Sequence, residues 1–487
     1  MAVALRPLKI GFVPANRGFF STVLAAKMRR QTIDAMTALG VEVIVPSDEQ
    51  TKAGCVENIA EAEVAAKIFR DADVDAIVIG AVNFGDEQAA AWTVRQTRLD
   101  VPILVFGCQE EETLNMQTAR RDSFCGLLSI GEALRQIGKK YSVMPRAILM
   151  PTDREFAEGM DWFVRVARVV QGMKNARYGQ IGARPEGFWT CRFDEKQLQR
   201  LGPTTVVLDL SEVFGACERM ADDDARVTEL VASIKDYADT SAVQDGSVIK
   251  SAKLEAFLRE WKKANRIDAY AIQCWTSIQA NYGVCSCTTM SRFGDEGVPS
   301  ACEADILGTL SMHAAQLASG SPAALADWNN LHNDDDELVN VWHCGVFPKS
   351  FAKEQPRLGV QEIIAGSGAA KYEDSEGTVE FRAKEGPLTL TRVTQDPDGS
   401  WKVVIVEGHV EDNAAVTFGS YGWCRVAGLQ DLYRNILVTH FPHHVAMTQG
   451  HVGNVLWEAF GNYLDMKVYR VHQPTPGLYV PSLPFSA

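Results

Sequence analysis

The first third of the chain alternates short apolar segments with longer amphipathic ones. Segments of about five Val- and Ile-rich residues are typical of buried strands, and the longer segments have the apolar spacing of helices. The predicted strands are 9–13, 41–45, 76–80 and 102–106, and the predicted helices are 21–39, 58–69 and 86–97. Ser21 suits the N-cap of the first helix and Gly40 suits its end. Repeated β–α units of this kind predict a parallel sheet covered on both faces.

The same character continues beyond Pro145. Segments 204–210 and 269–274 predict buried strands, and segments 221–237 and 250–265 predict helices. On such sheets, ligands bind past the carboxyl ends of the strands. No G-x-G-x-x-G sequence follows the first strand, which disfavours a dinucleotide-binding role.

The pattern changes after residue 337, where short predicted strands follow one another closely. They are 379–382, 388–392, 402–406 and 415–418, and residues 430–464 return to helix-like content. Close spacing with turns such as Asp396-Pro-Asp-Gly399 predicts antiparallel hairpins. We therefore predict an α/β protein with two Rossmann-like α/β domains that contain parallel sheets, followed by a β-rich, antiparallel barrel-like C-terminal domain. The predicted domains are 1–145, 146–320 and 321–487.

Composition narrows the class of partner and the compartment. The formal net charge of −14 over 487 residues argues against nucleic acid or an anionic membrane as the main partner. Eleven cysteines spread along the chain indicate reduced thiols in the cytoplasm. The first residues run into a strand pattern without a secretory signal, and no stretch of about 18 apolar residues predicts a membrane span. We expect a cytoplasmic protein.

Two acids and a group of histidines are the strongest candidates for chemistry. Glu303 follows a Gly/Pro loop and precedes an apolar helix-like segment, and Asp327 ends a run of small residues. Four of the nine histidines lie between His440 and His451. Oxygen donors together with imidazole suit a divalent ion that keeps positions open for substrate oxygens. Either acid alone is more often a helix cap or a surface residue than a metal ligand. A histidine cluster is as often part of a surface or interface as part of a metal or proton-transfer site.

Other residues allow two interpretations each. Arg17 follows the first strand, where an arginine can reach a ligand or simply face solvent. His343 ends a predicted strand and is either a site residue or a hydrogen-bonded core histidine. Cys285, Cys287 and Cys302 match no common zinc spacing, so buried free thiols are the favoured interpretation.

Four stretches, taken in order, resemble the L-fucose isomerase and L-arabinose isomerase family. The last of them resembles the family's segment in which a histidine precedes a Gly-His-Ile/Val-Gly turn. The sequence is shorter than typical L-fucose isomerases, and His443 stands where they often have Asn. The four stretches are Ala301-Cys-Glu-Ala-Asp305, Ala326-Asp-Trp328, the strand pair 386–392 with 402–408, and His444-Val-Ala-Met-Thr-Gln-Gly-His-Val-Gly453.

The resemblance implies one divalent ion, usually Mn²⁺ with other divalent ions allowed, held by Glu303, Asp327 and His444. His343 corresponds to an additional histidine used by L-arabinose isomerases. The family also implies a homo-oligomer, hexameric or trimer-based, whose active site is shared between subunits, so that Arg17 would reach a neighbouring subunit's site. The side chains expected near the sugar are Arg17, Gln273, Trp275, His343, Trp423 and His451.

The function that the resemblance implies is a metal-dependent aldose–ketose isomerase. It would interconvert an open-chain aldose and its 2-ketose through an enediol, with Glu303 and Asp327 as metal ligands and as the acid/base pair. The substrate would resemble L-fucose, D-arabinose or L-arabinose, or a deoxy- or sulfo-sugar. The alternative is a non-catalytic, two-lobed sugar-binding protein, and a metal-dependent hydrolase is a third hypothesis.

Overall fold

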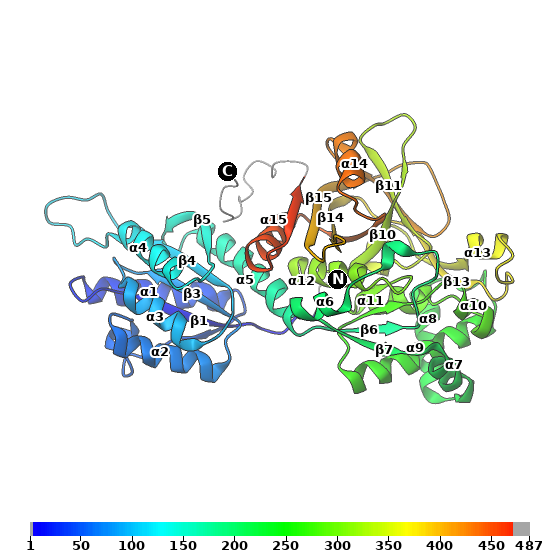
Figure 1. Cartoon of the computed structure of the whole chain (residues 1–487), viewed down its shortest axis with the longest axis horizontal. Helices are drawn as coiled ribbons and strands as arrows, with labels where there is room; N and C mark the ends of the chain where they lie inside the picture. The colour runs from blue at the N-terminus through cyan, green and yellow to red at the C-terminus, as the bar shows by residue number, and fades with distance from the viewer. Residues whose placement is uncertain (1–2, 471–487) are drawn as a thin grey trace. The chain divides into compact units, whose positions relative to one another are not determined.

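The computed structural model describes residues 3–470, which form two compact units (Figure 1). The N-terminal unit contains Leu5–Gln171 and Asn454–Asp465. The larger unit contains Gly172–Gly453 and residues 466–470. The larger unit therefore includes most of the predicted second and third domains. The predicted divisions after residues 145 and 320 stay predictions.

The N-terminal unit has a five-stranded parallel sheet of strand order β2-β1-β3-β4-β5. Ser21 caps α1 by accepting a hydrogen bond from the Leu24 amide, and Gly40 follows the helix in the left-handed region, as predicted. The alternation of strands and helices expected for this region is confirmed. The strands are β1 (Lys9–Ala15), β2 (Glu42–Ile44), β3 (Ala76–Ala81), β4 (Ile103–Cys108) and β5 (Ser142–Leu149), and the helices are α1 (Thr22–Ala38), α2 (Ile59–Ala72), α3 (Glu87–Thr97), α4 (Ser123–Gln136) and α5 (Arg154–Lys174).

The larger unit begins with a four-stranded parallel sheet of order β7-β6-β8-β9. The carboxyl ends of β8 and β9 lead into the loops that carry Gln273 and Glu303. The strands are β6 (Arg177–Ile181), β7 (Thr204–Leu208), β8 (Ala269–Ile272) and β9 (Ser300–Ala301), and the helices are α6 (Glu195–Leu201), α7 (Leu210–Arg219), α8 (Ala225–Tyr237), α9 (Asp245–Asn265), α10 (Ser277–Tyr282), α11 (Cys287–Asp295) and α12 (Ile306–Ser319).

The second half of the larger unit is a nine-stranded sheet that closes on itself. Its order is β12-β13-β16-β11-β10-β17-β14-β15-β18, and a further β15–β16 pairing completes a ring of six antiparallel strands. The predicted antiparallel barrel is therefore confirmed. The elements are β10 (Ala323–Leu331), β11 (Leu338–His343), β12 (Arg357–Val360), α13 (Glu362–Gly366), β13 (Glu376–Arg382), β14 (Gly386–Gln395), β15 (Trp401–Glu411), β16 (Ser420–Arg425), α14 (Leu429–Val438), β17 (His444–Gln449), α15 (Gly453–Trp457), a π-helical turn (Glu458–Tyr463) and β18 (Lys467–Arg470).

Three local predictions are wrong. The strand expected over 204–210 ends at Leu208, because Asp209 caps α7 by accepting from the Ser211 amide. The strand expected over 415–418 is absent, and β16 begins at Ser420 instead. His444 lies on strand β17, although its surroundings were expected to be helix-like. Short apolar segments do not distinguish strand from helix by periodicity alone, and pairing with β10 and β14 decides this one.

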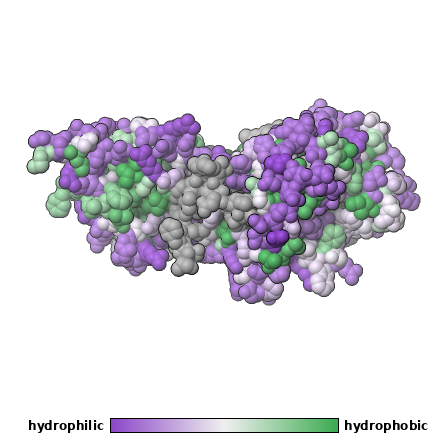
Figure 2. Space-filling model, turned by 90° about the horizontal axis from the view of Figure 1, so that it is seen from above, coloured by the Kyte–Doolittle hydropathy of each residue, from purple (hydrophilic) through white to green (hydrophobic). Residues whose placement is uncertain are grey.

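The described surface is mainly hydrophilic with scattered apolar patches on the face seen in Figure 2. This pattern accords with the net charge of −14. Among residues 3–470, no helix has the length and apolar character needed to cross a membrane.

Candidate active site

Glu303 lies in the short loop between β9 and α12. Its backbone and that of Ala304 are left-handed, with φ of 61° and 52°. Non-glycine residues rarely adopt this conformation, which costs about 1–3 kcal/mol per residue and persists only where the surroundings impose it. Here the Ala304 amide donates to the Ile272 carbonyl, and Asp305 caps α12 through the Gly308 amide. The neighbouring β8 and α12 thus hold the Glu303 carboxylate in place.

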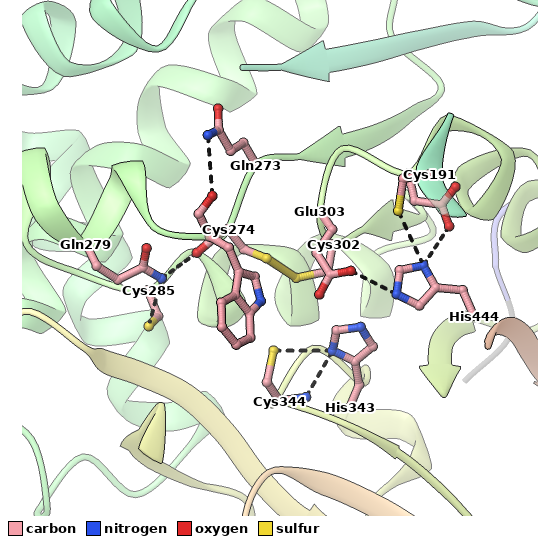
Figure 3. The surroundings of a disulfide bond; sticks show 12 residues. Cys191, Gln273, Cys274, Gln279, Cys285, Cys302, Glu303, His343, Cys344 and His444 are labelled. Carbon is pink, nitrogen blue, oxygen red and sulfur yellow. Dashed lines mark hydrogen bonds and ion pairs between the residues drawn. A yellow bond between two sulfur atoms is a disulfide. The ribbon is translucent and has the colours of Figure 1, made fainter. Parts of the chain in front are cut away.

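Asp327 and His444 are brought together by strand register. They are direct partners on the antiparallel strands β10 and β17. Opposed residues on such strands project to the same face of the sheet. Nε2 of His444 lies 2.9 Å from Oε2 of Glu303 (Figure 3). The same Nε2 lies 3.7 Å from Oδ1 of Asp327. His444 therefore lies close to both predicted acids. The possible ligand atoms fall into two sets within 4.8 Å of one another, one of Glu303, His343 and His444 and one of Asp327, His443 and His444. The set of three ligands predicted from the sequence stays a prediction.

Two buried polar atoms near His444 have no hydrogen-bond partner among the described residues, namely Asp327 Oδ1 and His343 Nε2. Glu303 Oε2 and His444 Nε2 face each other at 2.9 Å as an ion pair. The ligand atoms offered by Glu303, His343 and His444 lie within 4.8 Å of one another. Buried polar atoms normally find partners, so two without them beside a buried carboxylate–imidazole pair indicate a ligand. Carboxylate and imidazole donors fit a divalent ion such as Mn²⁺.

The charges of the site also favour a cation. Burial lowers the pKa of His343, but Cys344, Asp327 and Glu303 raise it more, to about 9. Burial likewise lowers the pKa of His444, but hydrogen bonding to Asp305 and the nearby Glu303 carboxylate leave it well above its ordinary value. Burial raises the pKa of Glu303, yet the neighbouring His444 holds it below its usual range. The carboxylates thus draw protons onto the histidines, and a divalent ion would supply that positive charge instead.

Asp305 has a role that the sequence did not reveal. It is fully buried, and its Oδ2 lies 2.8 Å from Nδ1 of His444. The buried Arg392 guanidinium donates to both Asp305 oxygens, at 2.5 and 3.1 Å. Burial raises the pKa of Asp305, but Arg392 and His444 hold it well below its usual range. Because an ionised carboxylate only accepts hydrogen bonds, Asp305 keeps a proton on Nδ1 of His444, and Nε2 is the nitrogen that an ion can bind once its own proton is displaced.

Metal affinity is expected to rise with pH. An ion must displace the proton that His444 carries on Nε2 in the ion-free protein, so affinity should rise about tenfold per pH unit below the raised pKa of that histidine. The stability that this group gives the ion-free protein has the opposite sign, being complete below about pH 6.5 and lost toward the folded pKa. Calorimetric Mn²⁺ titrations at pH 6, 7 and 8 test this. An affinity independent of pH would contradict it.

The prediction that Cys285, Cys287 and Cys302 are all free thiols is wrong for Cys302. Cys302, which precedes Glu303, forms a disulfide with Cys274 at the end of β8 (Figure 3). Cys285 and Cys287 are free and buried. Cys191 lies 3.9 Å from Nδ1 of His444, so the loop that precedes α6 also reaches the site.

The disulfide makes a count of thiols informative. The protein denatured without reductant is expected to expose nine thiols, and eleven after reduction. Reaction with a thiol reagent under both conditions gives the two values. Cys274→Ser serves as the control, because it should show the same number with and without reductant. Eleven thiols before reduction would contradict the pairing.

Two of the other predicted sugar contacts, Gln273 and Trp275, lie in one loop. Gln273 and Trp275 lie in the loop after β8, where Gln273 accepts from the Ala183 amide and Trp275 packs against Phe188. Nε1 of Trp275 is buried and without a partner among residues 3–470. Both residues flank Cys274 of the disulfide in the sequence, and their role as sugar contacts stays a prediction.

Within residues 3–470, Trp423 and His451 make their hydrogen bonds and ring contacts with residues other than Glu303, Asp327 and His444. Trp423 donates to the Ala415 carbonyl and packs edge-on against His332. His451 follows the far end of β17, which lies about 16 Å from the start of the strand at roughly 3.3 Å per residue, and its Nε2 contacts the Gly408 carbonyl. Arg17 belongs to the N-terminal unit, where it pairs with Glu87 and Asp86 and stacks over Phe84. Their roles stay predictions.

Known family models match the N-terminal and the C-terminal parts of the chain. Residues 11–174 match the family model described as "Fucose/sulfoquinovose isomerase, N-terminal domain", and residues 341–472 match "L-fucose isomerase, C-terminal domain". A sulfoquinovose isomerase of Priestia aryabhattai is 24% identical over 463 residues, which cover 94% of this chain and 98% of that protein. One from Alkalicoccus urumqiensis is 27% identical over 340 residues, covering 69% and 73%.

Among solved structures, an ABC transporter periplasmic solute-binding protein from Actinobacillus succinogenes with bound D-allose is 8% identical. It covers 64% of this chain and 92% of that one, with a TM-score of 0.16. A score this low carries no argument about fold or function.

Proposed function

Because this chain belongs to the fucose/sulfoquinovose isomerase family, we propose that it is a metal-dependent aldose–ketose isomerase with its active site at Glu303, Asp327 and His444. The observation that carries this proposal is the buried cluster in which the possible ligand atoms of Glu303, His343 and His444 lie within 4.8 Å of one another, with Asp327 Oδ1 3.7 Å from Nε2 of His444. Membership of a sugar isomerase family favours an enzyme over the non-catalytic sugar-binding alternative and over a hydrolase.

The residues of the site divide the chemical work between them. Glu303, Asp327 and His444 would hold a divalent ion, with Mn²⁺ as the first choice. When bound, such an ion acts as a Lewis acid on the two adjacent oxygens of the open-chain sugar. One of the two carboxylates would remove the proton from the carbon beside the carbonyl, and the other would serve the oxygens. General acid–base catalysis of this kind is worth about 100- to 10,000-fold.

The surroundings of Glu303, Asp327 and His444 suit this chemistry. Glu303 and His444 are buried, so water is largely excluded and electrostatic interactions are strengthened. Asp305 fixes the orientation of His444, and the β8–α10 loop supplies Gln273 and Trp275 as sugar contacts. Arg17 from a neighbouring subunit, Trp423, His343 and His451 complete the proposed set. A hexameric or trimer-based homo-oligomer in the cytoplasm remains part of the proposal.

The proposed substrate class is an aldose related to L-fucose, D-arabinose or L-arabinose, or a sulfonated aldose. The curated relatives named sulfoquinovose isomerase make sulfoquinovose the first sugar to test. The test is a panel of these four sugars incubated with the Mn²⁺-loaded protein, with products identified by NMR. Conversion of at least one aldose to its 2-ketose supports the proposal. The absence of conversion for all four, with metal bound, would refute it.

The same reaction run in D₂O separates the enediol route from a hydride shift. A proton removed by a carboxylate exchanges with solvent, so the enediol route is expected to place deuterium on carbon in the product. A direct hydride shift between the two carbons would leave the product without carbon-bound deuterium.

A further inference from the structure

An apolar groove of about 300 Å³ lies between α14 and the strands β10 and β11 (Figure 1). Leu331 and Leu437 line it with 47% and 67% of their surfaces exposed. The residues that line the groove include Trp328, Leu331, Tyr433, Leu437, Phe441 and Pro442. Large apolar side chains that are exposed together mark a surface that another segment or molecule covers.

The side chains of the groove favour an extended, proline-rich occupant. Trp328, Tyr433 and Phe441 give it three aromatic walls. Grooves lined by aromatic side chains bind polyproline II segments, which are already extended and lose little conformational entropy on binding. Within residues 3–470, none of the side chains that line the groove is a lysine, an arginine or a carboxylate. A strongly charged partner would therefore gain no ion pair there.

The part of the chain that the structure describes ends beside this groove. Strand β18 ends at Arg470, and the ring of Tyr469 packs edge-on against Phe441 with the centroids 5.5 Å apart. The ammonium group of Lys402 holds this corner, because it donates to the Thr439 carbonyl and lies 5.2 Å from the centre of the Phe441 ring. Since Phe441 also lines the groove, the sequence that follows Arg470 starts at the edge of the groove.

The sequence of residues 471–487 matches the chemistry of the groove. It contains no Lys, Arg, Asp or Glu, whereas 23% of the whole chain is charged. Its prolines are Pro474, Pro476, Pro481 and Pro484, and its larger apolar residues are Val471, Leu478, Tyr479, Val480, Leu483 and Phe485. Prolines at this density favour polyproline II, in which such a segment reaches about 50 Å at roughly 3.1 Å per residue. Helix α14 is only about 15 Å long, so the segment can span the groove.

We propose that residues 471–487 bind in this groove of their own chain and cover the exposed faces of Leu331 and Leu437. The covalent link favours this occupant over a free partner, because a linked segment is present at an effective concentration of about millimolar. The matched C-terminal family model ends at residue 472, so the proposal concerns a part of this chain beyond that match. His443 also lines the groove, and its Nε2 lies 3.8 Å from Oδ1 of Asp327. The bound segment would therefore cover the exposed side of a histidine that borders the candidate active site.

Photo-cross-linking of the full chain tests this proposal. Tyr479→benzoylphenylalanine places a photoreactive group in the segment, and mass spectrometry of the digested product identifies the peptides that it reaches. We expect cross-links to peptides within 429–443 of the same chain. When isotopically labelled and unlabelled protein are mixed, these cross-links should join peptides of equal label. Cross-links between labelled and unlabelled peptides would make a second copy the occupant, and cross-links elsewhere, or none, would leave the groove without this segment. Each of these results would overturn the proposal.

Two substitutions on α14 provide a matched pair. Leu437→Glu places a charge in the groove, and Val438→Glu places the same charge on the next residue, which is 69% exposed and lies outside the lining. The yield of the cross-link should fall about tenfold or more in Leu437→Glu, because the segment loses a buried leucine contact, and should stay unchanged in Val438→Glu. Without the photoreactive group, chymotrypsin should cleave after Tyr479 faster in Leu437→Glu than in Val438→Glu. Equal cross-link yields and equal cleavage rates in the two variants would contradict the proposal.

Discussion

Glu303→Gln is expected to lower kcat/KM by about 10,000-fold and to weaken Mn²⁺ binding in the same variant. The substitution keeps the size of the side chain, but it removes a charged oxygen that lies 2.9 Å from Nε2 of His444. An amide cannot take a proton from carbon, and loss of a general base alone costs up to about 10,000-fold. The measurements are metal content by elemental analysis and initial rates on the best sugar of the panel.

Glu63→Gln is a suitable control, because Glu63 is an exposed residue of α2 in the N-terminal unit. It should retain both the metal and full activity. Glu303 occupies a left-handed backbone conformation that an L-glutamine tolerates no worse, so the variant is expected to fold. Full activity in Glu303→Gln would remove this residue from the mechanism, whatever its metal content.

The fold was predictable from the sequence where local signals and tertiary structure agree. The N-terminal sheet has Val/Ile-rich strands that alternate with capped helices, and Ser21 and Gly40 mark the limits of α1 as expected. Strand β17 was missed, because its apolar residues satisfy a helix and a strand equally well over six positions. Its identity depends on pairing with β10 and β14, which lie far away in sequence.

The candidate site was predictable only in part, for the same physical reason. Asp327 and His444 lie 117 residues apart, and strand register alone makes them neighbours. Resemblance to a family supplied that pairing, which spacing could not. Asp305 had no such support. From the sequence it is an ordinary helix cap, and it does cap α12, but its contacts with Arg392 and His444 require the folded barrel. The Cys274–Cys302 pair is likewise formed by the ends of two adjacent strands.

Asp305→Asn is expected to damage both stability and metal binding, although Asp305 need not touch the ion. Arg392 is 0% exposed, and Asp305 is its ion-pair partner in the described structure. Removing one member of a buried ion pair leaves the other charge uncompensated and costs about 3–5 kcal/mol of unfolding free energy. The substitution also replaces a pure acceptor with a group that can donate to Nδ1 of His444. The imidazole would then lose the acceptor that holds a proton on Nδ1 and orients Nε2 toward an ion, and metal affinity should fall about 10- to 100-fold.

Urea unfolding and Mn²⁺ titration of Asp305→Asn measure the two effects separately. Asp194→Asn provides the matched control, since Asp194 also caps a helix, accepting from the Lys196 and Gln197 amides, but lies at an exposed position. Asparagine is as good a cap as aspartate, so the control should lose little stability. A variant of Asp305 that unfolds at lower urea but binds Mn²⁺ normally would reduce Asp305 to a structural role. A loss of affinity that persists where the variant is fully folded would instead show that metal binding depends on how this carboxylate orients His444.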